Sequence, residues 1–204
     1  MGYEEGTALF GPNATGKTTL LKTIIGYEEI IMNGEIYFEG KRIDGLKSYE
    51  RANLGLGFCH QIPPELEGIK VEEMKKEVGV VEEFPELYER FKGRECFKNM
   101  SGGERKLLEL YLTLIKKPKC LLLDEIDSGV DFENLEKIKE VLNKIGKRIC
   151  IIGVSHSLSF YEGLKFFKKG VLLVDGQIKY VGEFKEVYDI VKNMKSWSEV
   201  NEYI

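Results

Sequence analysis

Continuous apolar runs recur along the chain and predict the strands of a buried sheet. One run at residues 7–10 ends at Gly11, and another at residues 120–123 precedes a pair of acidic residues. A third run covers residues 149–154, and a shorter one at residues 54–58 indicates a further strand. These runs do not alternate with polar residues, which is typical of strands that are covered on both faces.

Between the runs lie segments whose apolar residues recur at the spacing of a helix. They cover residues 17–25, 101–117, 135–145 and 184–194. Ser101 followed by Glu104 forms the pattern of a capping box, and Pro118 forbids continuation of that helix. Strands and helices in alternation predict an α/β fold, a parallel sheet with helices on both faces.

Two turns complete this outline. Residues 171–174 and 178–181 flank Asp175-Gly176, a pair favoured in the type I′ turn of a β-hairpin. Residues 34–40 predict a strand that ends in a turn.

One stretch departs from the alternating pattern. From residue 62 to residue 100 the sequence changes to prolines and short charged helices, predicted around residues 71–77 and 83–91. We therefore expect a single domain that carries an inserted helical subdomain. The first part of the core is expected at residues 1–61, the insertion at residues 62–100 and the second part of the core at residues 101–204.

Charge and cysteine count narrow the class of protein. The 30 lysines and arginines against 34 acidic residues give a net charge of −4, which argues against a nucleic-acid partner bound by a broad basic face. No apolar run approaches the ~20 residues of a membrane helix and no secretory signal opens the chain, so we expect a cytoplasmic protein without direct membrane insertion. Four widely spaced cysteines predict reduced thiols, two of them on buried strands, and no metal site built from cysteine and histidine. They are Cys59, Cys96, Cys120 and Cys150.

The residues between the first strand and the first helix match the GxxxxGK[ST] pattern of a phosphate-binding loop. They are Gly11, Pro12, Asn13, Ala14, Thr15, Gly16, Lys17 and Thr18. Glycines let backbone N–H groups turn toward phosphate oxygens, and the positive end of the following helix adds to the attraction. We expect Lys17 to reach the β- and γ-phosphates, Thr18 to offer its hydroxyl to Mg²⁺, and Thr19 to bond a phosphate oxygen. The alternative is a glycine-rich turn before an ordinary helix.

Two carboxylates follow the apolar run at residues 121–123. Asp124 and Glu125 stand where a doubly wound sheet places its ligand sites, at the carboxyl end of a strand. Asp124 is the candidate anchor for Mg²⁺, and Glu125 is the candidate acceptor of a proton from water that attacks the γ-phosphate. Alternatively, acidic residues in this place merely cap the next element.

Three further features have an ordinary explanation when each is taken alone. Ser101-Gly102-Gly103-Glu104 marks a helix start, although its glycines also leave N–H groups uncovered for a phosphate. His156 follows a predicted strand, and a lone histidine is more often structural than catalytic. Gln61 by itself is a loop residue.

The order of these five features resembles the motif sequence of ATP-binding cassette (ABC) ATPases, from about residue 7 to the end. The resemblance implies that Gln61 touches Mg²⁺ and the attacking water, and that His156 contacts the γ-phosphate. It implies that Ser101-Gly102-Gly103 covers the γ-phosphate held by the opposite subunit, and that residues 128–131 cross the dimer interface. Two copies are then expected to close head to tail around two ATP molecules.

The chain departs from the family pattern in three places. Met100 and Glu104 stand where the signature usually has Leu and Gln, which should not disable phosphate contact. Only ten residues precede Gly11, whereas family members usually carry about two more strands there and an aromatic residue that stacks on adenine. Unless Tyr3 replaces that residue, the resemblance leads us to expect weakly held adenine or a chain that lacks its natural N-terminus. The insertion is also short.

The residues after Glu125 distinguish branches of the family. Transport ATPases typically have Pro-Thr and Ala-Leu in this stretch, whereas Asp127-Ser128-Gly129 resembles SufC, the ATPase of Suf iron–sulfur cluster assembly. That branch implies a SufB/SufD-like scaffold as partner, and the alternative is the membrane subunits of a transporter. Chromosome-maintenance ATPases are disfavoured, because the 39 residues between Gln61 and Ser101 lack sustained heptads. A non-hydrolysing regulatory module is also disfavoured, because the motif residues are all present. They are Lys17, Asp124, Glu125 and His156.

A partner of either kind is expected to dock beside Gln61 and the insertion. Five apolar residues there are candidates for contact, and the alternative is that they pack a small core under the insertion. They are Ile62, Leu66, Ile69, Val71 and Phe84.

Overall fold

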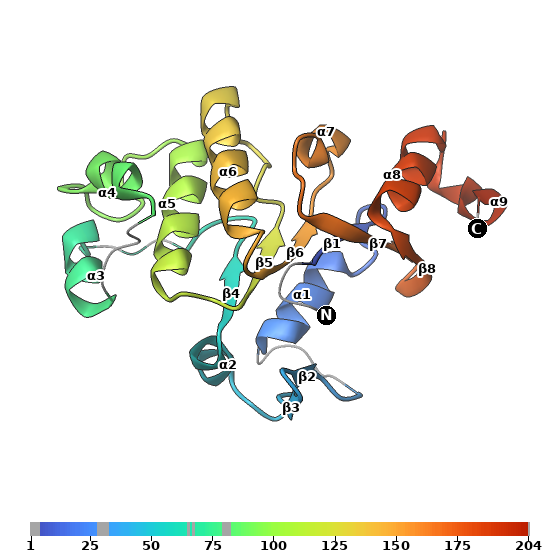
Figure 1. Cartoon of the computed structure of the whole chain (residues 1–204), viewed down its shortest axis with the longest axis horizontal. Coiled ribbons are helices and arrows are strands. Elements are labelled where there is room, and N and C mark those ends of the chain that lie inside the picture. The colour runs from blue at the N-terminus through green and yellow to red at the C-terminus, as the bar shows by residue number, and fades with distance from the viewer. Residues whose placement is uncertain (1–4, 28–32, 65, 67, 79–82, 204) are drawn as a thin grey trace.

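A six-stranded sheet runs through the centre of the protein in the computed structural model (Figure 1), which describes residues 5–27, 33–64, 66, 68–78 and 83–203. The strand order is β4-β5-β6-β1-β7-β8. Neighbouring strands from β4 to β7 are parallel, and only β8 pairs antiparallel, with β7. The strands are β1 (Gly6–Phe10), β4 (Leu56–Cys59), β5 (Cys120–Asp124), β6 (Cys150–Val154), β7 (Phe167–Val174) and β8 (Gln177–Glu183).

Helices cover both faces of this sheet, as the alternating pattern predicts. The longer helices are α1 (Lys17–Ile25), α5 (Gly102–Ile115), α6 (Phe132–Ile145) and α8 (Phe184–Asn193). The shorter ones are α2 (Ser48–Leu54), α3 (Val71–Val78), α4 (Pro85–Phe91), α7 (Leu158–Tyr161), α9 (Val200–Tyr203) and the 3₁₀ turn Trp197–Glu199. None of the helices in the described part of the chain has the length and apolar character needed to cross a bilayer.

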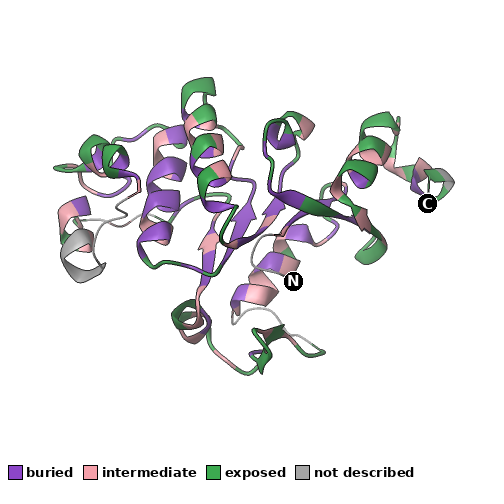
Figure 2. Ribbon diagram, viewed as in Figure 1, coloured by how far each residue is buried: buried purple, intermediate pink, exposed green. Residues whose placement is uncertain are grey.

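Alternate residues of strand β5 face two separate cores. Leu121 and Leu123 of β5 belong to the larger core, together with the apolar residues of α5 and α6. Leu122 belongs to the smaller core, which includes Leu21 and Ile25 of α1. Figure 2 shows the resulting buried layer across the middle of the molecule. The prediction that β5 is covered on both faces is therefore confirmed.

Several local predictions are confirmed in detail. Helix α1 ends at Gly26, which has a φ of 85°. The capping box is formed, since the Ser101 hydroxyl accepts from the backbone N–H of Glu104 at 3.2 Å and the Glu104 carboxylate accepts from the N–H of Ser101 at 3.0 Å. Asp175 and Gly176 both have positive φ, as a type I′ turn requires.

The strand predicted at residues 34–40 is shorter than predicted, the turn at its end is confirmed, and the arm that follows the turn was not predicted. Residues Tyr37–Phe38 (β2) and Lys41–Arg42 (β3) form a small antiparallel hairpin apart from the main sheet. The turn between them contains Glu39 and Gly40, both with positive φ. Helices α2 and α7 were not predicted, and the four residues of α7 are too few to show a helical period.

The predicted helices in residues 62–100 correspond to α3 and α4, and their apolar residues are mostly internal. Val71 and Phe84 are each only 1% exposed and join the larger core, so their assignment to a docking surface is wrong. Leu66 and Ile69 are half-buried against the same core. Only Ile62, at 80% exposed, keeps the character of a docking residue. The division of the chain at residues 61 and 100 stays a prediction.

Candidate functional site

The predicted phosphate loop connects β1 to α1 and carries no ordinary helix cap. Gly16 occupies the N-cap position with a φ of 93°, a conformation that glycine adopts most easily, and no side chain caps the helix there. The first N–H groups of α1 are thus left for another acceptor, which suits an anion. Lys17 is buried, and its Nζ donates to the carbonyl oxygens of Gly11 and Pro12 at 2.8 and 2.7 Å.

The other residues of the loop differ in exposure. Thr15 is buried, and its hydroxyl donates to the carbonyl oxygen of Pro12 at 2.9 Å, which closes the loop on itself. Asn13, Ala14 and Thr19 are exposed. Tyr3, which was considered for stacking on adenine, lies outside the described residues.

Thr18 and Asp124 meet across the gap between α1 and β5. The Thr18 hydroxyl donates to Oδ1 of Asp124 at 2.8 Å. Burial raises the pKa of the Asp124 carboxyl and the charge of Glu125 adds to this, although the bond from Thr18 acts in the opposite direction. A cation would stabilise the charged form. A hydroxyl and a carboxylate are oxygen ligands that Mg²⁺ accepts alongside phosphate oxygens, so this pair fits a magnesium ion.

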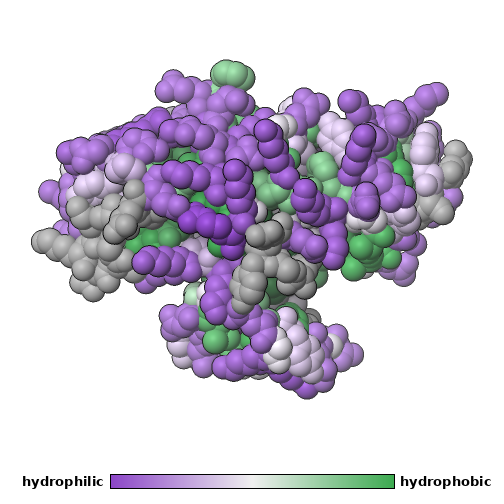
Figure 3. Space-filling model, viewed as in Figure 1, coloured by the Kyte–Doolittle hydropathy of each residue, from purple (hydrophilic) through white to green (hydrophobic). Residues whose placement is uncertain are grey.

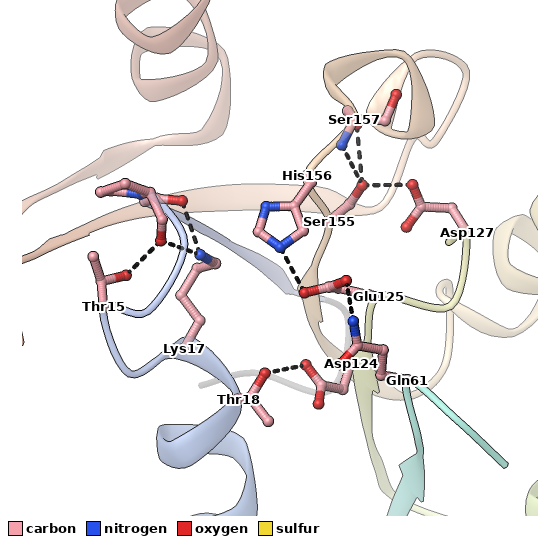
Figure 4. A network of polar contacts seen from close by, with 12 residues as sticks. Thr15, Lys17, Thr18, Gln61, Asp124, Glu125, Asp127, Ser155, His156 and Ser157 are labelled. Atoms are coloured by element: carbon pink, nitrogen blue, oxygen red, sulfur yellow. Dashed lines mark hydrogen bonds and ion pairs between the residues drawn. The ribbon is translucent and has the colours of Figure 1, made fainter. Parts of the chain in front are cut away.

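Two side chains hold the carboxylate of Glu125, one on each oxygen (Figure 4). Gln61 donates from Nε2 to Oε2 at 2.8 Å, and Nε2 of His156 lies 2.6 Å from Oε1. Glu125 itself is buried and has a φ of 49°, a strained value for a residue with a side chain. Gln61, Glu125 and His156 follow β4, β5 and β6, whose carboxyl ends meet at one edge of the parallel sheet.

The positive charge of Lys17 interacts with the carboxylates of Asp124 and Glu125. Burial lowers the pKa of the Lys17 amine, while the charges of Glu125 and Asp124 act to raise it. The structure therefore brings together six predicted residues from four segments of the chain, with a cation facing two carboxylates. They are Lys17, Thr18, Gln61, Asp124, Glu125 and His156.

The remaining predicted residues, Ser101 to Gly103, pack elsewhere in the chain. They begin α5 and lie against the loop before α6. A Cβ atom on Gly102 would come within 2.9 Å of the carbonyl oxygen of Gly129, and one on Gly103 within 2.8 Å of Oδ2 of Asp131. The two predicted interface segments, residues 101–103 and 128–131, thus form one continuous, largely exposed surface.

Sequence reasoning missed a second group of polar residues beneath Gln61. Both carboxylate oxygens of Glu109 on α5 accept from the N–H of His60 at 3.1 Å, and Oε1 lies 2.6 Å from His60 Nδ1. The Tyr27 hydroxyl is 2.5 Å from Nε2 of the same ring. One helical turn earlier, Lys106 donates from Nζ to the carbonyl oxygen of Glu125.

A sequence signal for these residues exists. Lys106 and Glu109 are charged residues within the apolar pattern of α5, and they are only 3% and 6% exposed. Charged side chains in such positions are rarely buried unless they have partners. Their partners could not be named in advance, because they lie 19 and 49 residues away.

We expect Glu109→Ala to destabilise the protein by about 1–3 kcal/mol, because it leaves the His60 N–H without its acceptor in a half-buried place. Urea unfolding measures this change. Glu136→Ala is the matched control, since Glu136 is an exposed glutamate of α6 and its loss should change the free energy of unfolding by less than about 0.5 kcal/mol. Equal effects of the two substitutions would show that the contacts of Glu109 add nothing to stability.

Comparison with known proteins decides the family. Residues 1–128, more than half of the chain, match the family described as ABC transporter. An uncharacterized ABC transporter ATP-binding protein of Methanocaldococcus jannaschii is 32% identical over 201 residues, which cover 87% of this chain and 80% of that protein. The chain belongs to the ABC transporter ATPase family.

Solved structures of ABC ATPases agree with this assignment in fold. A nucleotide-free ATP-binding cassette from an ABC transporter superposes with a TM-score of 0.77 and 23% identity, over 97% of this chain and 88% of that one. A dimeric ATP-binding cassette in a post-hydrolysis state, bound to ADP and phosphate, gives a TM-score of 0.68 and 20% identity, over 90% and 87% of the two chains. The observed sheet flanked by helices is thus the P-loop fold of ABC ATPases.

Proposed function

We propose that this ABC ATPase binds ATP with Mg²⁺ at the loop of residues 11–18 and hydrolyses it in a head-to-tail dimer. The observation that carries the proposal is the carboxylate of Glu125, held on one oxygen by Gln61 and on the other by His156, beside the Thr18–Asp124 pair. Release of phosphate from ATP, measured with and without Mg²⁺, tests it.

Each side chain has a role that follows from its position. Lys17 exchanges its bonds to the carbonyl oxygens of Gly11 and Pro12 for bonds to the β- and γ-phosphates, aided by the free N–H groups of α1. Thr18 and Asp124 would hold Mg²⁺, which would supply neutralising charge at the phosphate oxygens. Glu125 accepts a proton from the attacking water, while Gln61 and His156 keep its carboxylate in one orientation.

The signature residues point to a second copy of the chain. Ser101-Gly102-Gly103 lies against the loop before α6, and within the described residues the side chain of Ser101 bonds to Glu104 rather than to residues 11–18 of its own chain. The exposed helix N-terminus at Ser101 suits a phosphate group brought by another subunit. We propose that each site consists of Lys17 and Glu125 from one subunit and Ser101 from the other.

For the partner, we propose the membrane subunits of a transporter, reached from the cytoplasmic side. The relative from Methanocaldococcus jannaschii carries a transporter name, and the exposed Ile62 directly follows Gln61. A partner that binds Ile62 would move the residue that holds Glu125. This position therefore links docking to catalysis.

A second candidate partner is a SufB/SufD-like scaffold of iron–sulfur cluster assembly. The observation in its favour is the stretch Asp127-Ser128-Gly129, which resembles SufC. Asp127 accepts from the Ser155 hydroxyl at 2.7 Å, so this stretch is tied to the residue that precedes His156. Recovery of the partner from native extract separates the two candidates, since one is a membrane protein and the other is not.

We expect Ile62→Glu to change the free energy of unfolding by less than about 0.5 kcal/mol, because the side chain is exposed in the single chain. The same substitution should abolish recovery of the partner, because it places a charge in the proposed contact. Thermal unfolding and affinity purification measure the two effects. Ile178→Glu on β8 is the control, since Ile178 is 58% exposed and lies on the last strand of the sheet. Full partner recovery by the Ile62→Glu chain would remove this surface from the proposal.

A further inference from the structure

Two of the four cysteines lie side by side at the end of the sheet opposite to the nucleotide site. Cys120 begins β5 and Cys150 begins β6, and the two are direct register partners on parallel strands. Their side chains project to the same face of the sheet and join the smaller core beside α1. Neighbouring strands lie about 4.8 Å apart, which is within the Cα separation that a disulfide spans.

The two thiols also influence each other electrostatically. The neighbouring Cys150 thiol and burial together raise the pKa of the Cys120 thiol well above its ordinary value. The neighbouring Cys120 thiol lowers the pKa of the Cys150 thiol, although burial acts against it. The Cys150 thiol donates to the carbonyl oxygen of Glu5 at 3.5 Å. Cys150 is also the more exposed of the two thiols, at 9% against 5%, so a reagent reaches it first.

A cavity gives small molecules a route to this pair. Cys120 and Cys150 line a space of about 520 Å³ between the sheet, the end of α1 and the β2–β3 hairpin. Most of its other walls are apolar, including Ile24, Ile36 and Phe38, and Lys119 and Glu39 form an ion pair of 2.5 Å among its lining residues. Figure 3 shows the lobe that carries the hairpin standing apart from the larger body of the molecule.

The other two cysteines lack these features. Cys59 ends β4 and its thiol donates to the Thr113 hydroxyl at 3.8 Å, with burial raising its pKa well above the ordinary value. Cys96 lies in the loop between α4 and α5. All four cysteines are free and buried, and three of them lie on strands where the sequence predicted two.

We propose that Cys120 and Cys150 form a modification site, a dithiol that a low-molecular-weight disulfide oxidises to an intramolecular disulfide. The Cys150 thiolate attacks one sulfur of the reagent, forms a mixed disulfide and releases one small thiol. The Cys120 thiol then gives up its proton and attacks the Cys150 sulfur, and the second small thiol leaves with the bonding electrons. The protein loses two hydrogens, and the reagent is reduced to two thiols.

The bond would join the starts of the two strands that lead to Glu125 and His156 at their other ends. The proposal does not depend on ATP hydrolysis, because it concerns thiol chemistry at the opposite edge of the sheet. Its test therefore fails or succeeds separately from the proposed function.

The test uses the full reduced chain, incubated with cystamine and then analysed by mass spectrometry without reduction. We expect the intact protein to lose two hydrogens, the peptides that contain residues 120 and 150 to be joined, and dithiothreitol to reverse the change. An unchanged mass would overturn the proposal. A bond that involves Cys59 or Cys96, or a stable mixed disulfide on the native chain, would overturn it as well.

Single substitutions test the order of attack. Cys120→Ser should accumulate one cysteamine on Cys150, because the resolving thiol is absent, whereas Cys150→Ser should acquire none at Cys120. The Cys59→Ser/Cys96→Ser double variant serves as the control and should behave as the native chain does. Equal modification of the two single variants would contradict the assignment of Cys150 as the attacking thiol.

Discussion

The Glu125→Gln chain is expected to bind ATP with Mg²⁺ but to hydrolyse it about 10²–10⁴-fold more slowly than the native chain. The substitution keeps the shape of the side chain but removes the group that takes the proton from water. Unhydrolysed ATP should then hold two subunits together, through Lys17 of one and Ser101 of the other. Phosphate release measures the first effect, and light scattering after size exclusion with ATP measures the second.

Glu136→Gln is the matched control for this prediction. Glu136 is an exposed glutamate on α6, so its substitution should leave both hydrolysis and association unchanged. Normal hydrolysis by the Glu125→Gln chain would show that another group activates water. A monomer that keeps bound ATP would instead argue against a site shared by two subunits.

Lys17→Ala is expected to weaken ATP binding by at least about 10-fold, because each hydrogen bond from a charged donor contributes about 1.5–3 kcal/mol. Two phosphates share this lysine in the proposed site, so the loss should exceed that of one bond. Lys17 is only 5% exposed and points back to the loop carbonyls, which leaves no other cation placed in the same way among the described loop residues. Equilibrium binding of ATP with Mg²⁺ measures the change.

Lys116→Ala is the control for the loss of one positive charge away from the proposed site. Lys116 is an exposed lysine after α5, and its removal changes the net charge by the same amount. Thermal unfolding of both variants shows whether each is folded. Unchanged binding by a folded Lys17→Ala protein would remove residues 11–18 from the nucleotide site.

Local signals account for the parts of the fold that the sequence predicted well. Gly26 ends α1, the side chains of Ser101 and Glu104 start α5, and Asp175-Gly176 forms its hairpin turn, all through contacts within a few residues. In the hairpin at residues 37–42, the first arm and the turn were predicted but the second arm was not, because the two arms have two residues each. So short a pair has no period to detect, and its turn at Glu39-Gly40 carries the more informative signal.

The sequence predicted which residues form the candidate site but not how they contact one another. Motif order named Glu125, Gln61 and His156, yet their hydrogen bonds depend on β4, β5 and β6 being neighbours in the sheet. The bond from Lys106 to the Glu125 carbonyl oxygen and the contact of Glu109 with His60 depend on how α5 packs over that sheet. Long-range packing of this kind leaves only an indirect trace, a charge at a buried helical position.

A mixing experiment with two inactive variants tests the shared site most directly. Lys17→Ala removes the phosphate-binding lysine, and Ser101→Arg blocks the exposed start of α5 that should cover the ATP of the other subunit. In a head-to-tail dimer of the two variants, one site has both defects and the other has neither. We predict that each variant alone releases no phosphate from ATP and that an equimolar mixture recovers hydrolysis. Hydrolysis at the native rate by the Ser101→Arg chain alone would contradict the account, because it would show that one chain contains the whole site.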